Sequence, residues 1–377
     1  MHPSHTRAAV LSAHRSALEM QHVPLPDKIA PGAALVRITC STLCGTDVEI
    51  WSGKMSIPDM LPMILGHEMV GEIVALGPGT RDALGRELQL GDRIGWSEST
   101  CGECFACVVL REPVHCSHRG YGFLQRSDVP PYATAGLAEY AYVTPGAGKC
   151  RLPVTVKDTW ASMAGCAAKT VLRAYQRTGG IRPGSRVAVQ GSGALGLFAA
   201  AVAKISGAAR VITIGSPSAR LELARRFGAD DVIDIADGAV VETVMSMTDG
   251  QGVDHVFDFA GASSVGPEAI GMAAVRGTYT VVGSTGPDSD PFPLSAVMGK
   301  ELTIVGSLNG DIADYVRAIE FFEAFSDRFP WDELFSKPVG LAQASAKLES
   351  MDQLCEVKAV IDPRLDSSDF LSKGPDA

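Results

Sequence analysis

The sequence predicts an α/β protein with a mostly-β domain and a second domain built on a doubly wound parallel sheet. Residues 8 to about 160 are rich in glycine, proline and short apolar runs, which favours antiparallel strands joined by long loops. After about residue 160, strand-like runs alternate with helical stretches, which indicates a parallel sheet with helices on both faces. We therefore expect two domains, as the length of 377 residues also suggests.

The mostly-β domain is predicted to comprise residues 1–160 and 306–377. The runs 34–39 and 69–76 predict strands, and the prolines and glycines at 77–79 and 130–131 predict turns, so that a barrel-like antiparallel region results. A helix is predicted over 312–325. The chain then has a mixed pattern, is expected to return to the first domain, and ends in a polar tail.

The doubly wound domain is predicted over residues 161–305. A helical pattern covers 160–179, and the buried run 186–190 predicts the first strand of the sheet. The remaining predicted strands are 211–214, 231–234, 255–259, 278–282 and 302–305, and the clearest predicted helices are 194–206 and 218–227.

Charge and composition exclude several classes of function. With 33 basic and 43 acidic side chains the net charge is −10, which argues against a nucleic-acid partner. The N-terminus lacks the apolar run of a secretory signal, and the most apolar stretch, 194–205, is too short to cross a membrane. Nine cysteines, an odd number in a metal-like cluster, favour reduced thiols and a cytoplasmic location.

A glycine-rich turn predicts a dinucleotide site. Gly191, Gly193 and Gly196 follow a predicted strand and open a predicted helix, with Ala194 and Leu195 between them. The first glycine allows the tight turn, the second lets the backbone approach a pyrophosphate, and the third lets helix and strand pack closely. The helix N-terminus would then face the phosphates.

The end of the next strand favours NADP over NAD as the predicted cofactor. A carboxylate at this place would accept from the ribose 2′-hydroxyl of NAD, but the run 211–214 ends in Gly215 and Ser216. Ser216 could donate to a 2′-phosphate, and Arg220 lies one turn further along. This preference for NADP is modest, because Pro217 occupies the place where a phosphate-binding arginine would be most useful.

Four cysteines within sixteen residues predict a structural zinc site: Cys101, Cys104, Cys107 and Cys116. Thiolates suit zinc, and four of them complete a tetrahedron without an open position. His115, next to the last cysteine, is an alternative ligand.

A second zinc site is suggested by scattered residues. Cys44, His67 and Cys166 would supply three protein ligands and leave a position open, as catalytic zinc sites do. Spacing alone does not establish this site, since each of the three could instead be a buried core residue.

Several motifs in order resemble the zinc-dependent alcohol dehydrogenases of the medium-chain dehydrogenase/reductase superfamily. They are Cys44-Gly-Thr-Asp47, Gly66-His-Glu-Met-Val-Gly71, Gly91-Asp-Arg93, the four-cysteine segment and the glycine-rich turn. The resemblance covers about residues 8–363. It implies a GroES-like catalytic domain interrupted by a Rossmann domain, two zinc ions per chain, and interconversion of an alcohol with an aldehyde or ketone by hydride transfer with a nicotinamide dinucleotide.

The resemblance also implies the roles of single residues. The catalytic zinc would lie on the three scattered ligands, with Glu68 beside it or exchanging onto it. Thr46 would take the proton of the substrate, Asp47 would orient His67, and Lys358 would lie near the pyrophosphate. Glu49 stands where some members place a relay histidine, which leaves the outward route of the proton open.

Substrate and assembly are the least defined predictions. Trp51, Trp96 and Ser97 are expected near the wall of the substrate pocket, with the two tryptophans as packing residues in the alternative. The loop 119–136 is expected to shape the entrance of this pocket. The substrate is a small-molecule alcohol or carbonyl, and the resemblance implies homodimers or homotetramers. Alternatives are a polyol or sugar dehydrogenase, a zinc-free quinone or enoyl reductase, and a non-catalytic protein that binds zinc and dinucleotide.

Overall fold

The computed structural model describes residues 2–55, 57, 59–283 and 292–366, which form two compact units. One unit contains the described residues of 1–166, 310–326 and 331–377, and the other contains 167–309 and 327–330. The first unit is mostly antiparallel β-structure and the second holds a parallel sheet, so the predicted fold class is confirmed. The polar tail predicted at the C-terminus lies outside the described residues.

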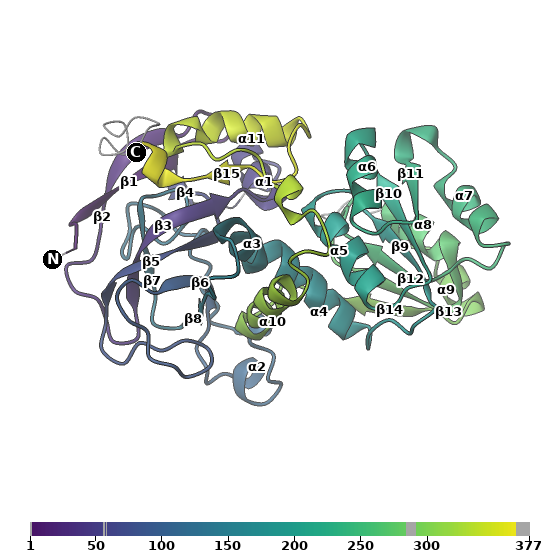
Figure 1. Ribbon diagram of the computed structural model, residues 1–377, viewed down its shortest axis with the longest axis horizontal. Coiled ribbons are helices and arrows are strands. Elements are labelled where there is room, and N and C mark those ends of the chain that lie inside the picture. The colour runs from purple at the N-terminus through teal and green to yellow at the C-terminus, as the bar shows by residue number, and fades with distance from the viewer. Residues whose placement is uncertain (1, 56, 58, 284–291, 367–377) are drawn as a thin grey trace. The chain divides into compact units, whose positions relative to one another are not determined.

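The first unit has two antiparallel sheets (Figure 1). One runs in the order β15-β3-β5-β6-β8, with β7 also paired to β3, and the other runs β2-β1-β4. The strands are β1 (His5–Leu11), β2 (Glu19–Pro24), β3 (Ala34–Thr42), β4 (Met63–Ile64), β5 (Glu68–Leu76), β6 (Arg93–Ser99), β7 (Tyr140–Val143), β8 (Ala147–Arg151) and β15 (Val360–Ile361).

The helices of this unit are short and lie between or beside the strands. They are α1 (Gly45–Ser52), α2 (Phe105–Val108), α3 (Asp158–Met163), α10 (Ile312–Ala324) and α11 (Ala344–Asp352). Single 3₁₀ turns occur at Pro113–His115, Trp331–Leu334, Leu341–Gln343 and Pro363–Asp366. A π-helical turn, Ala164–Ala168, directly follows α3.

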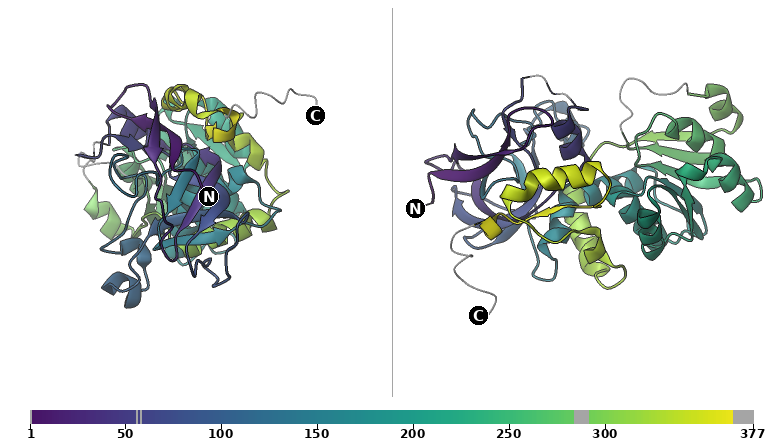
Figure 2. Two further views of the ribbon diagram at one scale, coloured as in Figure 1. Left: turned by 90° about the vertical axis from the view of Figure 1, so that its left-hand side faces the viewer. Right: turned by 90° about the horizontal axis from the view of Figure 1, so that it is seen from above.

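Strand β3 brings distant parts of the sequence together. Eight of its nine residues are buried, as expected for an apolar strand with neighbours on both sides. At its end Thr42 lies opposite Glu68 of β5 and opposite Val360 of β15. The C-terminal segment, yellow in Figures 1 and 2, thus returns to the start of this unit, where α11 also packs on α1.

The second unit is a six-stranded parallel sheet in the order β11-β10-β9-β12-β13-β14. Its strands are β9 (Arg186–Gln190), β10 (Arg210–Gly215), β11 (Asp231–Asp234), β12 (Val253–Asp258), β13 (Ala273–Val281) and β14 (Thr303–Gly306). Its helices are α4 (Lys169–Arg177), α5 (Ala194–Ile205), α6 (Ser218–Arg226), α7 (Val240–Met247), α8 (Val265–Met272) and α9 (Leu294–Gly299), with a 3₁₀ turn at Ile235–Asp237.

The strand order of this sheet positions a binding site. The chain moves outward from β9 through β10 to β11, and then crosses back to β12 on the other side of β9. Right-handed crossovers place α5 and α6 on one face and α7 and α8 on the other, and each pair is in contact. In such sheets ligands bind beyond the carboxyl ends of the strands where the order reverses, here at the end of β9.

No helix among the described residues is long and apolar enough to cross a membrane.

Candidate functional site

The four-cysteine segment folds into a compact sulfur cluster. The sulfurs of Cys101, Cys104, Cys107 and Cys116 all lie within 4.8 Å of one another, and His115 is not part of this group. Backbone N–H groups point at the sulfurs: the amide of Cys104 donates to Cys101 (3.4 Å) and that of Cys101 donates to Cys116 (3.3 Å). Backbone amides of this kind lower the pKa of Cys104 to about 5, which favours the thiolate that a metal requires.

The scattered residues also meet. One ligand atom from each of Cys44, His67, Glu68 and Cys166 lies within 4.8 Å of the others, so the structure brings together all of the predicted catalytic ligands and the neighbouring carboxylate. Cys44 precedes α1, His67 precedes β5, and Cys166 lies in the π-helical turn after α3. Such turns occur often at functional sites, because the extra residue redirects a side chain.

Asp47 fixes the positions of two of these ligands. It is fully buried, accepts from the backbone N–H of Cys44 (2.8 Å) and of Gly66 (2.9 Å), and lies 3.3 Å from Nδ1 of His67. Burial opposes a charged ring, but Asp47 outweighs it and raises the pKa of His67 well above the usual value. A proton held on Nδ1 leaves Nε2 to bind a metal.

Glu68 is held by partners on both carboxyl oxygens. Thr42 Oγ1 donates to Oε2 (2.6 Å), and the ammonium of Lys358 donates to Oε1. Burial raises the pKa of Glu68 to about 7 although Lys358 opposes that shift. The sequence placed Lys358 near a pyrophosphate, whereas the structure places its ammonium on Glu68 with 1% of the residue exposed. Its contact with a pyrophosphate stays a prediction.

The two scattered thiols are coupled through a hydrogen bond. This bond lowers the pKa of Cys44 well below its usual value, and the charge of Lys358 adds to the effect against the cost of burial. The same bond and burial raise the pKa of Cys166 well above its usual value. Of the two thiols, Cys44 is therefore the one whose thiolate the surroundings favour.

The glycine-rich turn has the geometry that a pyrophosphate requires. Gly191 has a φ of +111°, and a Cβ on Gly196 would lie 1.8 Å from the carbonyl oxygen of Gly191. A Cβ on Gly193 would meet nothing within 4 Å, so the protein leaves space there for a close ligand. Ala194 begins α5, and Leu195 is half-buried in its first turn.

The end of β10 has no room for a carboxylate at its last residue. A Cβ on Gly215 would lie 2.5 Å from Oγ of Ser192, which belongs to the glycine-rich turn and donates to the carbonyl of Ser216 (2.8 Å). Ser216 and Arg220 are both half-buried at this end of the strand, with Arg220 in the first turn of α6.

Two family models cover most of the chain. The model described as zinc-binding dehydrogenase matches residues 194–324, and the model described as alcohol dehydrogenase GroES-like domain matches residues 30–153. A 5-exo-hydroxycamphor dehydrogenase from Pseudomonas putida is 32% identical over 367 residues, which cover 96% of this chain and 99% of the relative.

Solved structures agree with these matches. An alcohol dehydrogenase from Thermotoga maritima superposes with a TM-score of 0.88 at 28% identity, over 95% of this chain and 99% of the other. A zinc-binding dehydrogenase from Sinorhizobium meliloti, solved with NADP, superposes with a TM-score of 0.82 at 26% identity, over 96% and 100%.

The chain belongs to the zinc-dependent alcohol dehydrogenase family. It is an oxidoreductase that interconverts an alcohol with an aldehyde or ketone by hydride transfer with a nicotinamide dinucleotide. Zinc is the metal of this family, and both cysteine-containing clusters fit it, since thiolate and imidazole are the donors that zinc prefers.

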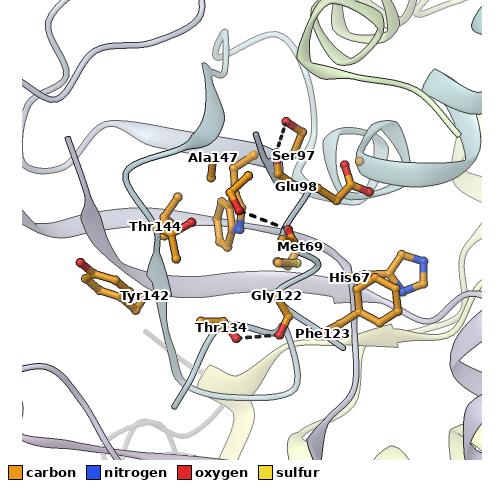
Figure 3. A pocket seen from close by; sticks show the side chains of 15 residues that line it. His67, Met69, Ser97, Glu98, Gly122, Phe123, Thr134, Tyr142, Thr144 and Ala147 are labelled. Atoms are coloured by element: carbon orange, nitrogen blue, oxygen red, sulfur yellow. Dashed lines mark hydrogen bonds between the residues drawn. The ribbon is translucent and has the colours of Figure 1, made fainter. Parts of the chain in front are cut away.

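A small pocket of this dehydrogenase opens beside His67 (Figure 3). Its volume is about 40 Å³, and Trp96 and Ser97 are among the residues that line it. Phe123 lines it as well, and its ring centroid lies 4.5 Å from that of His67. Phe123 belongs to the loop 119–136 that was expected at the entrance of the pocket, but no local motif marks this residue within the loop.

Trp51 lies elsewhere in the dehydrogenase. It is 7% exposed, packs in the hydrophobic core around β1 and β4, and donates from its indole N–H to the carbonyl of Ser16 (2.9 Å). The structure therefore makes Trp51 a packing residue, and it is not part of the wall of the pocket beside His67. The bulk that suggested a pocket residue fills the space between α1 and the β1 segment.

Thr46 lies in the first turn of α1, two residues after Cys44, and is half-buried. Glu49 is exposed one turn further along the same helix, and partial burial raises its pKa. The order of Cys44, Thr46 and Glu49 along α1 runs from the buried cluster toward the solvent.

Proposed function

We propose that this dehydrogenase holds two zinc ions per chain with different tasks. A zinc on Cys44, His67 and Cys166 is supported by the convergence of these three segments and by charge, because two thiolates and a neutral imidazole balance Zn²⁺. A zinc on the four-cysteine cluster is supported by the all-sulfur donor set, which leaves no open position. When bound at the first site, zinc supplies a Lewis acid for the substrate oxygen.

The residues around the first site bind, orient and move protons. Asp47 keeps the His67 ring in the orientation that its contact with Nδ1 defines. Thr46, half-buried two residues from Cys44, is the hydroxyl that takes the proton of the alcohol and passes it outward. Lys358 and Thr42 hold Glu68 beside the cluster, so that its carboxylate is not free to move.

The nicotinamide dinucleotide binds at the turn Gly191–Gly196, and NADP is the preferred form. The preference is supported by the end of β10, where Gly215 replaces a carboxylate and Ser216 and Arg220 offer donors. The relative from S. meliloti was solved with NADP. The nicotinamide supplies the hydride chemistry, and the chain supplies its orientation.

The substrate is a small alcohol or carbonyl compound with an apolar portion. The aromatic side chains Trp96 and Phe123 beside His67 support this choice, as does a relative that is a dehydrogenase of hydroxycamphor, an apolar bicyclic alcohol. A polyol substrate is the second candidate, and the thiol of Cys166 speaks against it. We also propose that the protein forms a homodimer or homotetramer. We propose a cytoplasmic location as well, and the nine free cysteines support it.

The observation that carries the proposal is the meeting of Cys44, His67 and Cys166 from three distant segments. The test is a zinc count on purified protein, followed by parallel assays with NAD and NADP over a panel of alcohols and aldehydes. Two zinc ions, hydride transfer and a lower KM for NADP are expected. One zinc ion, or no hydride transfer with any member of the panel, would contradict the catalytic site, and a lower KM for NAD would contradict the preference for NADP.

A further inference from the structure

The three segments that form the scattered cluster meet at one buried hydroxyl, that of Ser162. This residue is fully buried on α3, four residues and about one helical turn before Cys166. Its Oγ donates to the backbone carbonyl of Glu68 (2.6 Å) and accepts from the backbone N–H of Thr42 (3.1 Å). The hydroxyls of Ser162 and Thr42 lie 2.9 Å apart.

Each partner of Ser162 lies beside a metal-binding position. Thr42 is at the end of β3, two residues before Cys44, and Glu68 is at the start of β5, next to His67. The two bonds of Ser162 therefore connect α3 to both of the other ligand segments. Because both are made to backbone atoms, they fix the position of the segments and not only of side chains.

The other polar anchor of the cluster does not reach the third segment in this way. Asp47 bonds to the backbone of Cys44 and Gly66 and to the ring of His67, and so connects the first ligand segment with the second. The position of Cys166 depends on how α3 and its π-helical turn are placed.

Two further bonds hold α3 as a whole. Asp158, at the start of the helix, accepts from Thr39 Oγ1 (2.6 Å), and Tyr315 donates to the carbonyl of Ala161 (2.7 Å). These bonds orient the helix against β3 and α10. Ser162 is different, because it bonds to the residues that adjoin the ligands themselves.

The turn that carries Cys166 also packs against the backbone beside His67. A Cβ on Gly165 would lie 3.7 Å from Cα of Glu68 and 3.8 Å from the carbonyl oxygen of His67. Glycine has no Cβ, so no side chain of residue 165 helps to hold the turn against β5.

The geometry points to Ser162 as a positioning residue for the scattered metal site. We propose that its hydroxyl, bonded to the backbone at Thr42 and Glu68, sets the distance of Cys166 from the other two ligands and so retains zinc there. The inference rests on the proposed catalytic zinc. In Ser162→Ala the N–H of Thr42 loses its acceptor in a buried place, and the carbonyl of Glu68 loses its donor.

The test measures metal retention in the full-length protein. Zinc is counted in wild type and Ser162→Ala, and its release to a colorimetric chelator is followed over time, with the zinc of the four-cysteine cluster as an internal reference. We expect the catalytic zinc of Ser162→Ala to leave about 10 to 100 times faster, the range seen when residues that orient metal ligands are removed. The other zinc should leave at the wild-type rate.

A matched control lies on the same strand as Thr42. Ser41 is also fully buried, and its hydroxyl has no hydrogen-bond partner among the described residues, so Ser41→Ala removes a buried hydroxyl without cutting a bond. This variant should release both zinc ions as wild type does. Ser162→Thr, which keeps the hydroxyl, should also retain the metal, whereas Ser162→Val, which has the same shape as threonine without the hydroxyl, should release it faster.

Cobalt substitution provides a readout that general destabilisation would not move. Co²⁺ in the scattered site of wild type and Ser162→Ala is compared by its visible absorption, which reports ligand geometry, and the spectrum of the variant should shift while that of Ser41→Ala does not. A wild-type spectrum and wild-type release rate in Ser162→Ala would overturn the inference. Equal acceleration of both zinc ions would overturn it too, since that indicates loss of folding.

If Ser162→Ala cannot be purified folded, the same measurements on Ser162→Val against Ser162→Thr decide the question, since these two side chains have the same shape and differ in the hydroxyl; equal zinc retention in the two would refute the inference. Failure of the proposed function is a separate result, because it appears as a wild-type protein with only one zinc ion.

Discussion

The two cysteine-containing clusters differ in whether their residues are close together or far apart in the sequence. The cluster of Cys101–Cys116 comes from sixteen consecutive residues, three of its four cysteines are only partly buried, and backbone amides point at its sulfurs. The other cluster draws Cys44, His67 and Cys166 from three distant segments and holds them by buried side chains. The first cluster is thus formed by a single loop, and the second by contacts between distant segments of the fold.

The glycine-rich turn resembles the four-cysteine cluster, because it too is formed by residues that are close together in the sequence. Its proposed function depends on backbone atoms within six consecutive residues and on the absence of a Cβ at Gly191, Gly193 and Gly196. We therefore expect substitutions in the assembled cluster to affect chemistry, substitutions in the glycine-rich turn to affect cofactor binding, and substitutions in the four-cysteine cluster to affect stability.

The largest effect is expected for Cys44→Ala. Loss of one ligand of the assembled cluster should lower kcat on the order of 10³-fold or more, because the Lewis acid is worth several kcal/mol of barrier. Binding of the dinucleotide should remain, since Gly191–Gly196 belongs to the other unit. Steady-state kinetics and cofactor titration check both.

Cys150→Ala is the matched control for that variant. Cys150 is a buried cysteine on β8, outside both clusters, and burial raises its pKa, so it is an inert thiol. Its replacement should leave kcat near the wild-type value. If Cys44→Ala and Cys150→Ala had the same activity, the assembled cluster would not be the catalytic site.

The glycine-rich turn offers a sharper pair of variants. Gly196→Ala places a Cβ where only 1.8 Å separates it from the Gly191 carbonyl oxygen, so the turn must shift, at a cost of about 1–3 kcal/mol of folding free energy. Gly193→Ala meets no protein atom within 4 Å and should fold normally, yet bind the dinucleotide at least about tenfold more weakly because the phosphate can no longer approach.

Thermal unfolding and cofactor titration separate these two effects. Zinc content should be unchanged in both variants, which distinguishes the turn from the metal clusters. Normal cofactor affinity in Gly193→Ala would contradict the assignment of the turn as the pyrophosphate site.

Substitutions in the four-cysteine cluster should lower the stability of the folded protein. Cys104→Ala should release one zinc ion and lower the thermal midpoint by about 5–10 °C, since a loss of 2–3 kcal/mol corresponds to roughly that shift in a domain of this size. Turnover per remaining catalytic zinc should persist at low temperature. Cys355→Ala, at an exposed cysteine outside both clusters, is the control and should match wild type. A Cys104→Ala protein that kept two zinc ions and its midpoint would refute the structural role.

The same contrast explains what the sequence could predict. The strand 186–190 is β9 with identical bounds, and the other predicted strands of the sheet overlap β10 to β14, because each is a local apolar run between turns. The four-cysteine cluster and the glycine-rich turn are equally local. The assembled cluster became visible in the sequence only through several family motifs in order.

What the sequence missed depends on contacts between distant residues. The bond of Lys358 to Glu68 joins positions 290 residues apart, and spacing carries no information about it. The π-helical turn around Cys166 has no local signature, and the sequence left open whether Trp51 lines the pocket or packs in the core. In each case burial decides the outcome, and burial is a property of the fold.

A buried histidine of the parallel sheet provides the smallest test. His255 on β12 is 8% exposed, its Nδ1 has no hydrogen-bond partner among the described residues, and burial lowers its pKa. An unfolded histidine titrates near 6.5, so below that pH the unfolded chain binds a proton that the folded protein does not, and acid destabilises the fold. The contribution is at most about 1.4 kcal/mol per pH unit.

Replacing this imidazole should therefore make the stability of the folded protein depend less on pH. His255→Phe should lose less stability than wild type between pH 7 and pH 5.5, measured as the difference in unfolding midpoint, while kcat and zinc content stay unchanged. His22→Gln, an exposed histidine in the other unit, should leave the pH dependence of the parallel-sheet unit as it is. Parallel slopes for wild type and His255→Phe would show that the imidazole finds a partner in solution.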